Sequence, residues 1–365
     1  MAATSDDRSI CKVLHDEVKP AFVMVVVQAL FAGVNVAYKI AYAAGMNAAV
    51  LTFYRFLFAA GFIAPIAFIA ERSKRPKLTW IVVFQTFICG LIGIAIGMNL
   101  SVKIVIYSSA TFSAAIANLD PAITFIIAVI LRLERLGWQR PAGKAKVLGT
   151  IVGICGAIVF TSYKGPEINL WNTNINVLHS SPHLKLGTRP LLGAFLGLAC
   201  CVCYSLLLII QGKAADKYPC PYSFTALTLA MGSIQSFVYA LCVERNWEEW
   251  KLAWNVKLLA ITYLGTLGGG VLFAMSTWCV GVKGPVYVSA FTPLWLILMA
   301  IVGSLCLEEK LHLGYIFGGV LIMMGLYVVL WGKQEEIKRE KRGGDDEAQQ
   351  SVVEEEGELK NCKSP

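Results

Sequence analysis

Residues 78–97 read LTWIVVFQTFICGLIGIAIG, a run of twenty positions without a charged side chain. A helix needs about 20 mostly apolar residues to cross the hydrocarbon core of a bilayer. The apolar residues of this run are not confined to one helical face, as expected for a helix that also faces lipid. We therefore predict a transmembrane helix here, and the same test extends outward along the chain.

The composition agrees with a membrane protein. Of the 365 residues, 56% are hydrophobic and only 15% are charged, whereas soluble domains have about 25% charged residues. The predicted fold is an all-α integral membrane protein with ten transmembrane helices. These helices span residues 21–38, 48–70, 78–97, 107–131, 145–163, 190–211, 222–243, 257–280, 285–306 and 312–331.

Lysine and arginine are unevenly distributed between the two sides of this topology. They concentrate in the N-terminal tail, in the loops after the second and fourth helices, and in the C-terminal tail. Cytoplasmic segments carry such an excess of positive charge, so we predict that both termini are cytoplasmic. The net charge of +8 follows the same pattern and indicates orientation in a bilayer, not nucleic-acid binding.

The longest connection divides the predicted helices into two groups of five. An odd number in each half places the halves in opposite orientations, which is the inverted-repeat plan of secondary transporters. The predicted parts are a cytoplasmic N-tail (1–20), a first repeat (21–163), a non-cytoplasmic linker (164–189), a second repeat (190–331) and a charged, disordered cytoplasmic C-tail (332–365).

The two halves contain the same features in the same order. Each has an intramembrane proline, then a Leu-Glu turn, then a helix with two glycines seven residues apart. The features are Pro121, Leu133-Glu134, Gly149 and Gly156 in the first half, and Pro293, Leu307-Glu308, Gly318 and Gly325 in the second. This ordered set favours an internal repeat.

Several functional classes are disfavoured. The chain has no Gly-x4-Gly-Lys-Ser/Thr loop, so it is not an ATP-driven pump by itself. The first twenty residues lack the apolar core of a signal peptide. Cysteines lie mostly in apolar runs and histidines in tails, loops or at a helix mouth, so we expect no metal site and no cofactor. An intramembrane enzyme would need paired aspartates, a Ser/His dyad or a metal, and Asp120 is the only acid well inside a predicted span.

Two longer blocks of sequence carry a family resemblance. The first is SATFSAAIAN at 109–118 with PAITF at 121–125, and the second is TWCV at 277–280 with KGPVYVSAFTPL at 283–294. Shorter matches are Tyr54-Arg55, Arg75-Pro76, Tyr218-Pro219, 325–327 and 331–333. Together they resemble the plant EamA-type drug/metabolite transporters, in the nodulin-21-like branch that is also called UmamiT or WAT-related.

The resemblance covers about residues 20 to 333. It implies two five-helix repeats and transport of amino acids or related metabolites, while some relatives handle auxin-like molecules. This chain departs from the family at Met98-Asn99-Leu100-Ser101, where Gln-Asn-Leu-Tyr is common, and at Asp120, where a neutral residue is expected. These departures leave the substrate more open than the fold.

A solute path through such a bundle needs polar side chains that face a shared cavity. The competing interpretation is that serines and threonines bond carbonyls of their own helix or bridge neighbouring helices. The substrate-path candidates are Gln28, Asn35, Arg55, Asn99, Ser113, Asn118, Asp120, Thr124, Tyr204, Gln211, Thr266, Ser276, Ser289 and Thr292, and the hinge candidates are Pro121, Gly269 and Pro293.

Asp120 is the most informative of these residues. An unpaired charge in mid-membrane costs about 2.5–3.5 kcal/mol, so a wet cavity, a cationic substrate group, Arg55 or protonation must compensate. The backbone of Arg55 lies roughly 10 Å from the start of its predicted helix. Its side chain is predicted to snorkel to the outer interface, to pair with Asp120, or to hold a substrate carboxylate.

The leading hypothesis is a secondary transporter or facilitator that moves amino acids by alternating access, bidirectionally or for export. The alternatives are a transporter of auxin-like or other organic anions, and a membrane scaffold or receptor that transports nothing. The expected partners are a small-molecule substrate and the lipid bilayer, and the oligomeric state stays open. We expect the plasma membrane ahead of the vacuolar membrane.

Overall fold

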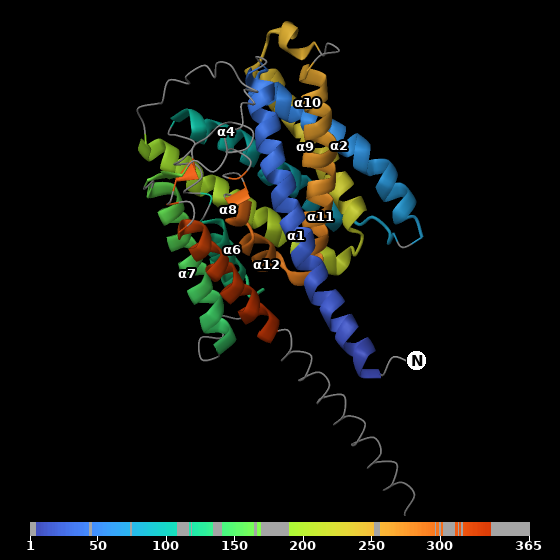
Figure 1. Cartoon of the computed structure of the whole chain (residues 1–365). Coiled ribbons are helices and arrows are strands. Elements are labelled where there is room, and N and C mark those ends of the chain that lie inside the picture. Colours follow the sequence, from blue (N-terminus) through green and yellow to red (C-terminus); the bar gives the residue numbers. More distant parts are fainter. Residues whose placement is uncertain are drawn as a thin grey trace, which may run out of the picture.

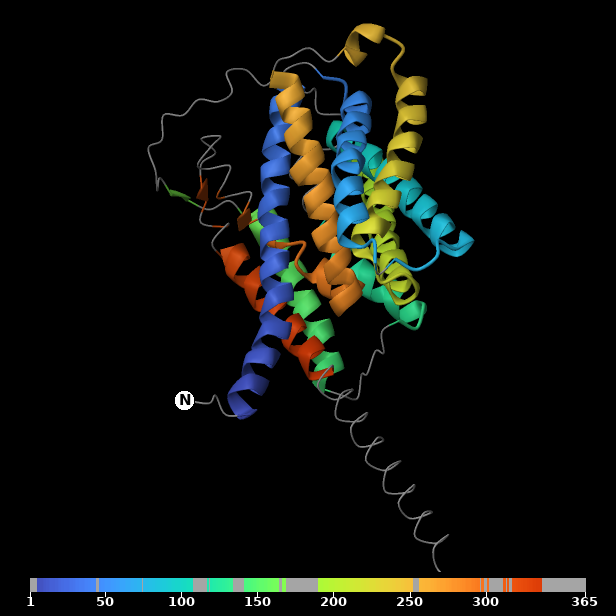
Figure 2. The same cartoon turned by 90° about the vertical axis from the view of Figure 1, so that its right-hand side faces the viewer.

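The computed structural model describes residues 5–43, 46–73, 75–107, 117, 119–133, 141–163, 166–168, 190–251, 256–295, 297–298, 301, 311–312, 314 and 317–336. These residues form a helical bundle that contains seven helices long and apolar enough to cross a membrane (Figures 1 and 2). The prediction of an all-helical membrane protein is confirmed at this level.

The first half contains α1 (Ser5–Ala43), α2 (Ala48–Ala70), α3 (Trp80–Cys89), the π-helix η1 (Gly90–Ile96), α4 (Gly97–Tyr107), α6 (Asp120–Ile130) and α7 (Pro141–Ser162). The second contains α8 (Pro190–Lys217), α9 (Pro221–Val243), the 3-10 helix η2 (Trp247–Trp250), α10 (Val256–Gly265), the π-helix η3 (Thr266–Val271), α11 (Leu272–Lys283), α12 (Pro285–Ala290) and a C-terminal helix (Phe317–Glu336). Two-residue strands, β1 (Glu167–Ile168) and β2 (Leu311–His312), pair antiparallel.

Several predicted boundaries differ from the structure. The third helix does not end near residue 97 but continues to Tyr107. The Asn99 side chain donates a 2.7 Å hydrogen bond to the carbonyl of Ala95, which offsets the free-energy cost of placing this polar side chain in lipid. α1 already begins at Ser5, inside the predicted N-tail. His312 lies in β2, and the C-terminal helix covers Phe317–Glu336 instead of 312–331. Residues 108–116 and 118 of the predicted fourth helix lie outside the described residues.

A π-helical segment interrupts the third predicted helix of each half. η1 packs against α8 and α9, which are the first two helices of the second half, and η3 packs against α1 and α2, the first two of the first half. The packing is reciprocal, because the π-helical segment of each half contacts the first two helices of the other half. π-segments are uncommon and frequently accompany functional sites.

α2 and α9 form the most extensive helix pair in the described chain. In Figures 1 and 2 they run side by side, and η2 lies at the end where α9 leads to α10. The α2 C-terminus meets the α9 N-terminus, because Glu71 contacts Tyr222 and Ser223. The α2 N-terminus meets the α9 C-terminus through Asn47 and Glu244. The two ends of this antiparallel pair are called the Glu71 end and the Glu244 end below.

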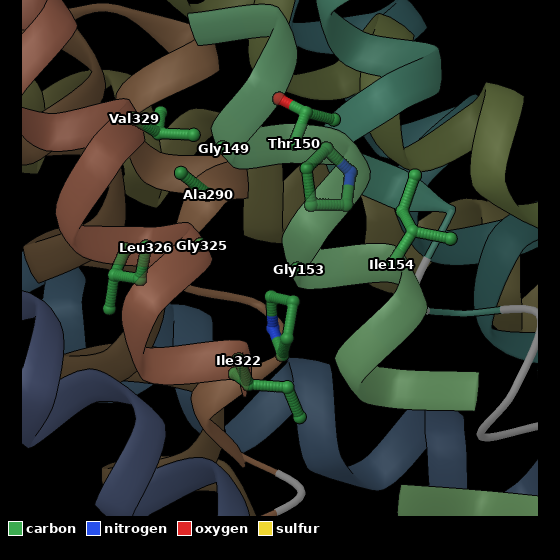
Figure 3. Close-up of a pocket in the computed structure, with 11 residues that line it drawn as sticks. Gly149, Thr150, Gly153, Ile154, Ala290, Ile322, Gly325, Leu326 and Val329 are labelled. Atoms are coloured by element: carbon green, nitrogen blue, oxygen red, sulfur yellow. The ribbon is translucent and has the colours of Figure 1, made fainter. Parts of the chain in front are cut away.

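α7 crosses the C-terminal helix at glycines. A Cβ atom on Gly149 would lie 2.7 Å from the carbonyl oxygen of Gly325, and one on Gly325 would lie 2.5 Å from the amide nitrogen of Gly153. Small residues allow membrane helices to approach this closely. These glycines, with the hinge candidates Pro121 and Pro293, line a narrow space of about 20 Å³. Figure 3 shows Gly149 and Gly153 facing Gly325 across it. Pro121, Gly149, Pro293 and Gly325, four of the recurring Pro and Gly residues of the two halves, therefore meet at one place.

Candidate functional site

A cavity of about 420 Å³ opens at the Glu71 end of the α2–α9 pair. The end of α2, the end of α8, the α8–α9 connection, the start of α9 and α11 form its walls. A volume of this order lies within the usual range for small-molecule sites, roughly 300–1,000 Å³. The lining residues are Ala70, Glu71, Gln211, Ala215, Tyr218, Pro219, Cys220, Pro221, Tyr222, Phe224, Thr277, Trp278, Gly281 and Val282.

Two polar side chains of this lining are buried without a hydrogen-bond partner. The Oε1 atom of Gln211 and the Oγ1 atom of Thr277 have none in the structure, although these residues are only 3% and 4% exposed. Buried polar atoms are normally satisfied, because an unpaired one costs about 1–3 kcal/mol. Gln211 and Thr277 are therefore suited to bind a polar solute in the cavity.

Aromatic side chains supply much of the remaining wall. Trp278, Phe224, Tyr218 and Tyr222 line the cavity. The Lys19 ammonium lies 5.5 Å from the centre of the Trp278 ring, a cation–π contact that holds the ring against α1. Burial raises the pKa of the Tyr218 phenol above its ordinary value, so this side chain stays neutral. The cavity thus combines flat apolar surfaces with a few polar groups.

Glu71 closes one side of the cavity as the cap of another helix. Its two carboxylate oxygens accept hydrogen bonds from the backbone amides of Tyr222 (2.9 Å) and Ser223 (2.7 Å), in the first turn of α9. A carboxylate at this position satisfies amides that have no partner within the helix and interacts favourably with the helix dipole. Glu71 is 6% exposed and lines the cavity.

A second polar cluster surrounds Asp120 at the start of α6. The Cys201 side chain lies beside the carboxylate, and Tyr204 lies beside both Asp120 and Thr292. One turn further along α6, Thr124 shares a 2.9 Å hydrogen bond with Ser205 of α8. The structure therefore brings together the predicted path residues Asp120, Thr124, Tyr204 and Thr292.

α8 connects this cluster with the cavity. Gln211 and Tyr204 are seven residues apart, which places both on one helical face. Gln211 lines the cavity and Tyr204 lies beside Asp120. The cavity and the Asp120 cluster therefore lie along one stripe of α8.

Other predicted path residues satisfy their side chains within their own helix. The Asn35 amide donates to the carbonyl of Phe31, as the Asn99 amide does to that of Ala95. The hydroxyls of Thr266 and Ser289 donate to carbonyls of Thr262 and Val286. Neither cavity described above is lined by any of these four, nor by Gln28 or Ser276. Ser113 and Asn118 lie outside the described residues.

Arg55 neither reaches the interface nor pairs with Asp120, and its third predicted role, holding a substrate carboxylate, stays a prediction. The residue is 1% exposed instead of reaching the interface, and it donates to the Tyr38 hydroxyl (2.6 Å) and to the carbonyl of Gly268 (2.7 Å) instead of to Asp120. The carbonyl is accessible because η3 packs closely on α2. A Cβ atom on Gly269 would lie 2.5 Å from that of Ala59. Arg55 thus joins α2 to the π-helical segment.

Glu71 and Thr277 were not among the sequence-based candidates. Glu71 follows directly on an apolar run, where an acid is commonly a solvated end of a helix, and its partner amides lie more than a hundred residues away. Thr277 opened one of the family-like blocks, but a lone threonine in a helix usually bonds its own backbone. The burial of both residues next to a cavity is visible only in three dimensions.

Comparisons with known proteins agree with this architecture. The model of the EamA-like transporter family matches twice, at residues 19–162 and 191–331. The WAT1-related protein At1g68170 of Arabidopsis thaliana is 41% identical over 319 residues, which cover 86% of this chain and 90% of the relative. An auxin-induced protein of Pinus taeda is 36% identical over 94% of this chain and 85% of its own.

A chain of known crystal structure shares the fold. It superposes with a TM-score of 0.61 at 18% identity and covers 88% of this chain and 98% of its own length. The family comprises transporters and not enzymes. The chain therefore belongs to the EamA-like transporter family, as a multi-pass membrane protein with two EamA repeats and close similarity to the plant WAT1-related proteins.

Proposed function

We propose that this protein moves amino acids across the membrane by alternating access. The observation that carries the proposal is the cavity at the Glu71 end, where the buried Gln211 and Thr277 have polar atoms without partners beside aromatic walls. An amino acid offers hydrogen-bonding groups for the polar atoms and a side chain that can pack against the aromatic walls. Ten helices in two inverted five-helix repeats provide the frame for this mechanism.

The path in this proposal follows one face of α8. A solute enters the cavity, contacts Gln211 and Thr277, and moves toward Tyr204 and Asp120. The amine of the solute and the carboxylate of Asp120 are complementary in charge, which compensates for the cost of each in the membrane. Rocking of the two repeats exposes the cluster to either side, with Gly269, Pro121 and Pro293 as candidate bending points.

The topology sets the direction of access. With both termini in the cytoplasm, as the distribution of lysine and arginine indicates, the Glu71 end faces the cytoplasm. The cavity is then the inner mouth of the carrier. We place the protein in the plasma membrane ahead of the vacuolar membrane. Fluorescence of tagged protein against markers of both membranes tests this assignment, and an exclusively vacuolar signal rejects it.

The aromatic walls favour a second substrate class. Trp278, Phe224 and Tyr218 offer flat surfaces on which an indole or phenyl ring can stack. An auxin-like organic anion therefore competes with amino acids as the solute.

The test is uptake by purified protein in liposomes. A panel of labelled amino acids and indole-3-acetate is offered on both sides of the membrane, with protein-free liposomes as the control. Saturable flux of at least one amino acid supports the proposal, and flux of indole-3-acetate alone favours the second class. Absence of flux across the panel would leave a scaffold or receptor and reject the carrier.

A further inference from the structure

The first turn of α9 has the properties of a carboxylate-binding site. Two of its backbone amides, those of Tyr222 and Ser223, converge on one carboxylate at 2.9 and 2.7 Å. Helix N-termini bind anions through such amides and through the helix dipole. α9 has 23 residues, so its dipole is fully developed. In this structure the bound carboxylate is the side chain of Glu71.

Partnerless polar groups lie around this position. The Oγ atom of Ser223 is buried, at 4% exposure of the residue, and lies beside the Tyr218 phenol without forming a well-aligned hydrogen bond. Gln211 and Thr277 line the cavity together with Glu71 and Tyr222, and the Oε1 atom of Gln211 and the Oγ1 atom of Thr277 have no hydrogen-bond partner. Each hydroxyl can donate to an incoming oxygen. Glu71 therefore satisfies the amides and leaves the surrounding side chains unsatisfied, as expected of a site built for a larger ligand.

The Glu244 end provides a contrast within the same helix pair. There Asn47 caps its own helix, because its Oδ1 atom accepts from the amide of Ala49 at 2.8 Å. Glu244 bonds the Asn47 side chain at 2.7 Å and not the first-turn amides of α2. The first turn of α2 is thus capped by a neutral side chain that directly precedes it in the sequence, whereas the first turn of α9 is capped by a carboxylate at the end of another helix.

The geometry points to exchange of carboxylates at the α9 N-terminus. The carboxylate of a transported solute takes the place of Glu71 on the amides of Tyr222 and Ser223, and its remaining polar groups reach Ser223, Gln211 and Thr277. One carboxylate replaces another, so the charge at the helix terminus is conserved. Because Glu71 holds α2 to α9, its displacement also frees the end of α2, which couples binding to opening of this end.

This inference rests on the proposed function and narrows it, since amino acids and auxin-like anions both carry a carboxylate. A displaced Glu71 side chain can reach a polar environment. It stands at the C-terminal cap of α2, at the end of the span, and Arg75 follows four residues later with an exposed side chain. A released Glu71 side chain is therefore able to return to water beside a cation.

Chemical rescue tests the site without reference to transport. Glu71→Ala vacates the amides, so sodium acetate is expected to raise the melting temperature of the purified variant saturably, while acetamide, a neutral molecule of similar size, does not. Wild-type protein should require roughly tenfold more acetate, because its own carboxylate competes. Glu244→Ala is the matched control and should show no acetate-specific stabilisation. Equal effects of acetate and acetamide on Glu71→Ala overturn the inference.

Glu71→Gln supplies the second measurement, since the amide retains one acceptor and disturbs folding less. For any carboxylate solute that the liposome assay identifies, this variant should lower KM roughly fivefold, because a weaker competitor occupies the site. A merely structural clamp predicts an unchanged or higher KM. If the wild type carries only solutes without a carboxylate, the exchange is rejected while the transport function stands.

Discussion

The two ends of the α2–α9 pair close in different ways. At the Glu244 end the rings of Phe53, Tyr54, Phe237 and Trp250 pack against one another, with ring centroids of Phe53 and Phe237 5.0 Å apart. The Tyr54 hydroxyl also donates to the carbonyl of Trp250. At the Glu71 end the corresponding space is a cavity of about 420 Å³ bridged by a single carboxylate.

The difference indicates that related ends of one helix pair have opposite tasks. Packed rings gain dispersion energy, so we expect the Glu244 end to be stable when closed. The Glu71 end depends on a charge-assisted contact, which another carboxylate can replace. Under our proposal, the structure is a carrier sealed at its outer end and accessible at its inner end.

Filling the cavity should produce the largest effect. Ala215 lines the cavity, so Ala215→Trp is expected to lower flux of any identified substrate by at least roughly tenfold, equivalent to about 1.4 kcal/mol. Val243→Trp places the same side chain on an exposed site at the Glu244 end and should leave flux within about twofold. Ala215→Phe gives a milder version if the first variant expresses poorly. Equal flux in the Ala215 and Val243 variants would contradict the claim that the solute passes through the cavity at the Glu71 end.

Neutralising the mid-membrane carboxylate should come next. Asp120→Asn keeps the shape of a buried side chain and removes its charge, so the uptake rate, its dependence on pH between about 5 and 8, or both should change. Uptake is compared at equal protein level in liposomes. Asp216→Asn, on the exposed end of α8, serves as the matched control. Wild-type behaviour of the Asp120 variant across this range removes Asp120 from the path.

Removing ring contacts at the Glu244 end should lower the stability of the protein and leave substrate binding unchanged. Trp250→Ala removes ring contacts with Phe53, Tyr54, Phe237 and Trp247, for an expected loss of about 2 kcal/mol. Thermal unfolding in detergent measures the loss, and KM for the identified substrate should stay unchanged. An unaltered melting temperature would mean that these rings do not seal the Glu244 end.

The smallest effect is expected at Asn35. Its amide serves only the carbonyl of Phe31 in the same helix, so Asn35→Ala should change stability by no more than about 0.5 kcal/mol and flux hardly at all. Melting and uptake of the purified variant measure both. A tenfold loss of flux would place the path along α1 and away from the Glu71 end.

Membrane character and the two-repeat family were predictable from local sequence. Long apolar runs and the Pro, Leu-Glu and Gly series are visible one segment at a time, and α2 coincides with the predicted 48–70. The site was only partly predictable. Gln211, Tyr204 and Asp120 were singled out because polar residues are costly in lipid. Sequence does not reveal whether such a cost is met within the helix, as at Asn99, or left open toward a cavity, as at Gln211.

Partners distant in sequence account for the remaining differences. Arg55 was expected to reach water, pair with Asp120 or hold a substrate carboxylate, but its guanidinium donates to the Tyr38 hydroxyl and to the carbonyl of Gly268 inside the bundle. Glu71 resembled the solvated end of a helix, but it caps α9. In both cases a backbone group is among the partners, and its availability depends on how closely two helices approach.

A structure determined with a transported solute bound tests the central claim most directly. We expect density for the solute at the Glu71 end, in contact with Gln211 and Thr277 and with a ring or alkyl group against Trp278. Density at the Glu244 end, or around Asn35 and Asn99 with the cavity filled only by solvent, would contradict the account.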